Sequence, residues 1–163
     1  YKISTGSFFT DSYGSEFFNF SNPHLFDFLF SYKKGAFLYT PILFLSLTGF
    51  YFFWKTDRYI FYGLLFFVLV LFYVLSSWWN WWYGGSFSSR VLIEFLPVFM
   101  LLLAKAIDGF RNKAVKGIFV GLIAICVLVN QIQIYQYRYG MIHFEQMDKQ
   151  KYWENFLRID RLL

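Results

Sequence analysis

The residues best suited to chemistry lie between Ser76 and Glu94, where polar groups interrupt a strongly apolar sequence. Arg90 and Glu94 are four residues apart, so they share one face of a helix if that helix begins by Ser88 or Ser89. Such a pair at the end of a membrane span usually faces a polar cavity or a partner, because charge is costly in lipid. A guanidinium also suits two-pronged contact with phosphate. The pair predicts either a bound lipid phosphate or a structural salt bridge at the start of a helix, and the residues alone leave both interpretations open.

The segment before Arg90 combines aromatic residues with a flexible turn. Positions 76–90 hold four Trp, one Tyr and one Phe, together with Asn80 and the pair Gly84-Gly85. An aromatic belt at the membrane interface explains Trp and Tyr near the end of a span. It does not explain the glycine pair, which permits close backbone approach to a ligand. We therefore predict a ligand-facing loop whose candidates for binding lipid phosphate or substrate are Asn80, Tyr83, Gly84, Gly85, Arg90 and Glu94.

Other titratable groups give weaker signals. His24 and Asp27 are three residues apart and suit a proton relay or a metal pair, but the capping of a surface helix is the favoured interpretation. His143 and Glu145 are weaker still. Cys126 is the single cysteine, so an intramolecular disulfide and a cysteine-based metal site are both excluded. No metal site and no resident cofactor are predicted, and the common phosphate-loop, hydrolase and zinc-protease motifs do not occur.

The composition indicates that a membrane surrounds these residues. The 163-residue chain is 58% hydrophobic and 26% aromatic but only 15% charged, whereas soluble domains carry about a quarter charged residues. A bilayer accommodates Phe in its core and Trp and Tyr at its interfaces. The formal charge of +5 comes from cations that stand between apolar stretches rather than along one element. This distribution is typical of anchors and lipid head-group contacts, and it disfavours a nucleic-acid partner.

The apolar stretches predict an all-α integral membrane protein with about four transmembrane helices, at about 35–54, 59–77, 91–104 and 117–134. The third span is short and holds Glu94 and Pro97, so it needs neighbours to satisfy its backbone. Residues 1–34 form an interfacial segment, including a short amphipathic helix from about His24 to Phe30. Residues 137–163 form a tail with helical apolar spacing from Lys149 onward. The transmembrane region is therefore predicted to cover residues 35–136.

The distribution of cations predicts the orientation. Six cations near span ends lie on one side and four on the other; the first set is Lys55, Arg58, Lys105, Arg111, Lys113 and Lys116, and the second is Lys33, Lys34, Arg90 and Arg138. Because the cytoplasmic side carries the excess, the first set is predicted to be cytoplasmic. Positions 76–90, which we call the tryptophan loop, and both termini of this chain then share the outer face.

Several short motifs resemble one family of bacterial enzymes. The N-terminal third contains Tyr13-Gly14, Phe18-Asn19-Phe20, Pro23-His24, the run from Leu29 to Gly35, and Tyr39-Thr40-Pro41; the later run from Trp81 to Arg90 is followed by Glu94 and Pro97. In this order they resemble the GT-C-type membrane glycosyltransferases of the protein-mannosyltransferase and aminoarabinose-transferase kind, in the form common in Bacteroidota. The resemblance covers roughly residues 1 to 100, and the later part matches only in its pattern of apolar stretches.

The resemblance implies a function and a location. Members of this family move a sugar from a polyprenyl-phosphate carrier to an acceptor at the periplasmic face of the bacterial inner membrane. It therefore implies a lipid-linked sugar as donor substrate, membrane lipids and membrane proteins as partners, and a multi-pass protein whose tryptophan loop and termini are periplasmic. Tyr83, Gly84, Gly85 and Arg90 match the family's aromatic-glycine-arginine pattern, which implies that Arg90 contacts the carrier phosphate.

The same resemblance implies that the catalytic residues lie elsewhere. The family places its catalytic carboxylates in the first outer loop of the full protein, and Asp11 and Glu16 lack the helix expected before that loop. This chain would then supply carrier-binding surface, with the catalytic residues upstream of Tyr1. The alternative prediction is a non-catalytic membrane subunit or an anchor of an envelope protein complex. A transporter is disfavoured because the spans lack paired interrupted helices.

Overall fold

The structure, a computed structural model, describes residues 16–159 as an assembly of helices without a β-sheet in that range. An isolated antiparallel bridge joins Phe18 to Trp78. Asp11 lies outside the described residues. In chain order the elements are α2 (Leu25–Phe30), α3 (Ala36–Tyr39), α4 (Pro41–Ser46), α5 (Thr48–Thr56), α6 (Arg58–Ser76), the 3-10 helix η1 (Arg90–Phe95), α7 (Leu96–Gly109), α8 (Lys113–Arg138) and α9 (Lys149–Asn155).

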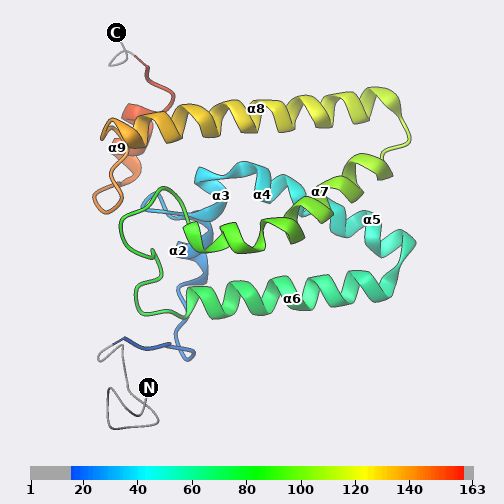
Figure 1. Cartoon of the computed structure of the whole chain (residues 1–163), viewed down its shortest axis with the longest axis horizontal. Helices are drawn as coiled ribbons and strands as arrows, with labels where there is room; N and C mark the ends of the chain where they lie inside the picture. Colours follow the sequence, from blue (N-terminus) through cyan, green and yellow to red (C-terminus); the bar gives the residue numbers. More distant parts are fainter. Residues whose placement is uncertain (1–15, 160–163) are drawn as a thin grey trace, which may run out of the picture.

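Two helices, α6 and α8, are long and apolar enough to cross a membrane. They contain 19 and 26 residues, which correspond to about 28 Å and about 39 Å of helix. Each begins at a side-chain cap: Asp57 accepts hydrogen bonds from the amides of the second and third residues of α6, and Asn112 does the same for α8. In Figure 1 the two helices run along opposite sides of the molecule, with α4, α5 and α7 between them.

The first predicted span, at about 35–54, is not one continuous helix. It consists of α3, α4 and α5, with breaks at Thr40 and Leu47. Thr40 has φ −136° and ψ 69°, which fits the rule that a residue before a proline avoids the helical region. Pro41 then opens α4, where its missing amide hydrogen is tolerated.

The third predicted span also differs from expectation. Residues predicted as one helix from about position 91 instead form η1, and α7 begins only at Leu96 and extends to Gly109. Pro97 is the second residue of α7, where it displaces no helical hydrogen bond. The 14 residues of α7 give about 21 Å of helix. The structure therefore presents two full-length candidate spans rather than four.

The helices pack around aromatic side chains at the loop-bearing end of the molecule. Phe72 of α6 lies with its ring centroid 6.3 Å from that of Phe28, 5.9 Å from that of Phe37 and 6.0 Å from that of Phe99. These four residues come from α6, α2, α3 and α7, so one ring joins four elements. Farther along, Gly49 of α5 faces the backbone of α7 without room for a side chain, which lets α5 and α7 pack closely.

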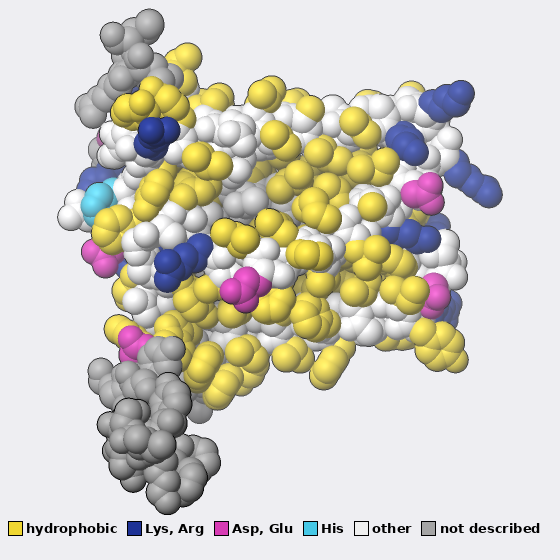
Figure 2. Space-filling model, viewed as in Figure 1, with side chains coloured by type: hydrophobic (Ala, Val, Ile, Leu, Met, Phe, Trp, Pro, Cys, Tyr) yellow, Lys and Arg dark blue, Asp and Glu magenta, His cyan; other side chains and the backbone are white. Residues whose placement is uncertain are grey.

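The outer surface of the long helices remains apolar. Phe66 of α6 is 71% exposed, and Ile118 and Leu128 of α8 are 67% and 63% exposed. Figure 2 shows hydrophobic side chains across the middle of the molecule, with Lys and Arg gathered mainly toward its two ends. Apolar patches of this extent mark a surface that contacts lipid or protein. The distribution therefore indicates association with a membrane.

The two predicted amphipathic elements are present as short helices. α2 occupies Leu25–Phe30, close to its predicted range. The tail helix α9 begins at Lys149 as predicted but ends at Asn155, well before the predicted end of the pattern. Leu157, shortly after α9, has a left-handed φ of 55°, which is incompatible with continuation of a right-handed helix.

Candidate functional site

The candidate site lies at the end of the molecule where the 77–89 loop meets the turn between α2 and α3. The N-terminal segment holds the start of this loop through backbone hydrogen bonds. The amide of Asn19 donates to the carbonyl of Ser77 at 2.6 Å, that of His24 to Ser76 at 2.9 Å, and that of Trp79 to Phe17 at 3.0 Å. The loop is therefore tied to a second segment rather than free at the surface.

Lys34, in the turn between α2 and α3, holds the other side of the loop. Its side chain is only 2% exposed. The ammonium donates to the carbonyl of Gly84 and, at 3.1 Å, to the hydroxyl of Ser86. The hydroxyl of Ser89 donates to the backbone carbonyl of Lys34 at 3.1 Å. One buried lysine thus fixes three points of the loop.

Three cations lie near one another here, Lys33, Lys34 and Arg90, and we call them the cation cluster. Burial, and after it the nearby positive charges of Arg90 and Lys33, lower the pKa of Lys34 to about 8, with Glu145 acting in the opposite direction. The ammonium of Lys33 lies 3.5 Å from the centroid of the Trp82 ring, a favourable cation–π contact. The cluster concentrates positive charge that a bound anion would stabilise.

Tyr83 and Gly84 form a left-handed turn beside Lys34. Tyr83 has φ 53° and Gly84 has φ 66°, so the backbone turns through two consecutive left-handed residues. Tyr83 is held by a hydrogen bond of 2.8 Å from its hydroxyl to the carbonyl of Leu75, and burial raises the pKa of its hydroxyl to about 12. The turn points the carbonyl of Gly84 at the Lys34 ammonium. Gly85 lies near the ring of Phe144 instead.

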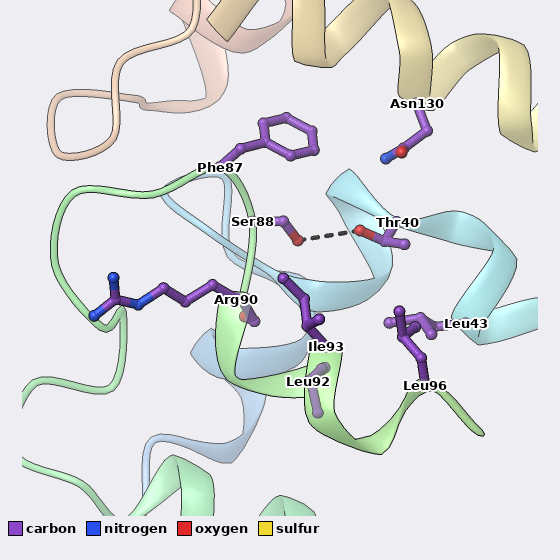
Figure 3. Close-up of a pocket in the computed structure, with 10 residues that line it drawn as sticks. Thr40, Leu43, Phe87, Ser88, Arg90, Leu92, Ile93, Leu96 and Asn130 are labelled. Carbon is purple, nitrogen blue, oxygen red and sulfur yellow. Dashed lines mark hydrogen bonds between the residues drawn. The ribbon is translucent and has the colours of Figure 1, made fainter. Parts of the chain in front are cut away.

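A cleft of about 200 Å³ begins next to the cation cluster. Its polar residues are Thr40, Ser88, Ser89 and Asn130, together with Arg90, and its apolar residues are Leu43, Phe87, Leu92, Ile93 and Leu96. The hydroxyls of Thr40 and Ser88 lie 3.2 Å apart, and the amide nitrogen of Asn130 donates to the carbonyl of Tyr39 at 2.7 Å. Figure 3 shows the two hydroxyls facing one another inside the cleft, whereas the guanidinium of Arg90 extends away from it. A cleft of this kind suits an apolar chain that ends in a polar group.

The predicted pairing of Arg90 with Glu94 is wrong. Both residues lie in η1, and a 3-10 helix has three residues per turn. Residues four apart are then about 120° apart around the axis rather than on one face. Both side chains are exposed, and no ion pair joins them. Because the residues just before α7 form a 3-10 helix instead of an α-helical turn, the two charges do not share a face.

The remaining predicted residues lie in the 77–89 loop. Gly84 and Tyr83 shape the turn, and Asn80 is partly buried with a side-chain oxygen that has no hydrogen-bond partner. None of the three lines the cleft.

Residues that sequence reasoning missed are Lys34, Thr40, Ser88 and Asn130. The lysine pair between two apolar segments was the available signal for Lys34, but nothing in the sequence marks Asn130, which comes from distant α8.

The two histidines form local contacts. His24 Nδ1 lies 3.4 Å from a carboxylate oxygen of Asp27 within the first turn of α2. The ring nitrogen of His143 accepts hydrogen bonds from the amides of Glu145 and Gln146 at 3.1 and 3.2 Å, which closes a turn. Within residues 16–159 no three side chains of His, Cys, Asp or Glu come together as a metal site.

Comparison with protein-family models, with curated proteins and with solved structures gives no match to this chain.

Proposed function

We propose that this chain is part of a membrane glycosyltransferase and supplies the surface that binds a polyprenyl-phosphate sugar carrier. The observation that carries the proposal is the cation cluster of Lys33, Lys34 and Arg90 beside a cleft with apolar walls. The motifs that resemble GT-C-type enzymes run through the same residues. The catalytic carboxylates would lie in another part of the full protein.

The two parts of the site match the two parts of the carrier. A phosphate or diphosphate is anionic, and binding it relieves the repulsion among the three clustered cations. A polyprenyl chain is apolar and suits walls formed by Leu43, Leu92 and Leu96. The hydroxyls of Thr40 and Ser88 stand between these regions as hydrogen-bond donors. Arg90 is exposed, and another staggered rotamer of its side chain would turn the guanidinium toward a phosphate at the mouth of the cleft.

In the proposed membrane arrangement, the chain crosses the bilayer four times. The broken segment α3–α5 and the combined segment η1–α7 would serve as the first and third of four spans, supported by their packing against each other and against α6 and α8. The excess of cations at the α5–α6 and α7–α8 turns favours the cytoplasm for that end. The cation cluster, the loop and both termini of the chain would then be periplasmic, in a bacterial inner membrane.

The test replaces Arg90 by Ala in the full protein. Hydrogen bonds to a charged group contribute about 1.5–3 kcal/mol, so carrier binding should weaken about 10- to 100-fold and sugar transfer should fall accordingly. The matched control is Arg138→Ala, which removes an exposed arginine at the same end of the molecule. Unchanged binding of polyprenyl phosphate by a folded Arg90→Ala protein would count against phosphate contact at this residue.

A second candidate function, a non-catalytic membrane subunit, is favoured by the outer face of α8. Ile118, Leu122, Ile125 and Leu128 are all more than two-fifths exposed, and a side-chain carbon added at Gly121 would meet no other atom. Such a face could pack against another membrane helix. Cysteine crosslinks from position 121 to one constant partner protein, together with no binding of polyprenyl phosphate by the wild-type protein, would favour this alternative.

A further inference from the structure

A second pocket lies at the opposite end of the molecule from the candidate site. Its volume is about 830 Å³. It lies where the end of α5 meets the turn between α7 and α8, and we call it the basic pocket. It is lined by the cations Lys55, Lys105 and Arg111, the single carboxylate Asp108, and neutral residues that include Phe52, Phe110 and Val115. Figure 2 shows the Lys and Arg side chains gathered at this end.

The cations of the basic pocket have no anionic partner in the described part of the chain. None of Lys55, Lys105 and Arg111 forms an ion pair with a carboxylate of residues 16–159. The ammonium of Lys55 lies 4.5 Å from the centroid of the Tyr51 ring, and that of Lys105 lies 5.2 Å from that of Phe53. Three cations and one carboxylate therefore line the basic pocket. Aromatic rings lie beside two of the cations. This arrangement favours an anion from outside the chain.

The surroundings of the pocket select the kind of anion. The pocket lies at the end of α8, one of the two helices long enough to span a membrane. Tyr51 and Val115, which line it, are 56% and 44% exposed, and the neighbouring Ile118 is 67% exposed. An anionic head group in the pocket would therefore have apolar surface beside it for its acyl chains. Basic pockets between membrane helices bind anionic lipid head groups in this way.

We infer that the basic pocket binds the phosphate head group of an anionic phospholipid. Lys55, Lys105 and Arg111 contact the phosphate, and Tyr51 and Val115 border the acyl chains. Asp108 opposes binding by repulsion. This site is separate from the carrier site and needs membrane insertion but no transferase activity.

The test measures retention of phosphatidylglycerol by the full protein. The protein is reconstituted in nanodiscs of phosphatidylcholine with phosphatidylglycerol, and bound lipid is quantified by native mass spectrometry against phosphatidylcholine alone. One variant carries Lys55→Gln, Lys105→Gln and Arg111→Gln. The matched control removes three exposed cations at the other end, Arg138, Lys149 and Lys151, by the same replacement.

Each basic residue near a lipid surface contributes about fivefold to binding an anionic lipid, so the triple variant should bind phosphatidylglycerol about 100-fold more weakly. The control should bind as the wild type does. Asp108→Asn preserves all three cations and should tighten binding about fivefold, which tests the inference even if the triple variant does not fold. Equal retention by the wild type and a folded triple variant, or no tightening by Asp108→Asn, would overturn it. Inorganic phosphate that displaces the lipid at equal concentration would overturn the assignment to a lipid.

Discussion

Replacement of Lys34 by Met should change how the stability of the protein depends on pH. In the folded protein, burial and the charges of Arg90 and Lys33 lower the pKa of Lys34 from 10.5 to about 8. In the unfolded chain the ammonium returns to water and to its ordinary pKa. Between these values the unfolded state binds the proton more tightly, so the free energy of unfolding rises with pH in this window. Below about pH 8 both states are protonated, and the buried charge opposes folding in full.

The size of the effect follows from the separation of the two pKa values, which corresponds to at most about 3 kcal/mol. For a chain of this length that equals a rise of about 6–12 °C in melting temperature. Met has a similar length but no proton to release. At neutral pH, replacement by Met stabilises the protein by removing a buried charge. It also destabilises the protein by removing the hydrogen bonds to Gly84 and Ser86. These two effects partly offset each other.

The measurement is thermal unfolding in a nonionic detergent from pH 7 to pH 10. The quantity of interest is the melting temperature of the wild type minus that of Lys34→Met, which should rise with pH above about 8. Subtraction removes the titration of all other groups. Lys149→Met is the control, because Lys149 is exposed and should leave the pH dependence of the wild type unchanged. Parallel curves for the wild type and Lys34→Met would refute the inference that burial and nearby charges lower the pKa of Lys34.

Two pairs of glycine variants test the packing by the same melting measurement. Gly84→Ala places a side chain at φ 66° and should lower stability by about 1–2 kcal/mol, whereas Gly85→Ala gains only an ordinary contact and should be neutral; equal effects would contradict the left-handed turn. Gly49→Ala forces a carbon into the backbone of α7 at Leu102 and should lower stability by about 1–3 kcal/mol or more, while Gly63→Ala meets open space. A neutral Gly49→Ala would show that α5 and α7 do not pack as described.

Composition and local sequence determined much of the helical framework. The apolar run at about 59–77 is long and uncharged inside, so its length and composition predicted the helix that the structure shows as α6. The apolar run at about 117–134 likewise predicted α8, although the helix extends beyond the predicted span at both ends, to Lys113 and Arg138. The excess of aromatic residues with few charges predicted a lipid-facing surface, and the exposed Phe66 and Ile118 agree with it. These properties depend on each segment alone, which is why the sequence was sufficient.

Tertiary structure decided the breaks in the other two segments and the composition of the site. Hydropathy averages over a window, so it did not separate a continuous helix from α3, α4 and α5, although Pro41 marked one of the breaks. It also did not show that Arg90 and Glu94 lie in a 3-10 turn, which removes their shared face. The contact between Lys34 and Gly84 joins residues fifty positions apart, and Asn130 reaches the cleft from α8. Such contacts depend on how separate helices pack. The tryptophan loop was therefore visible in the sequence, but its contact with the buried Lys34 was not.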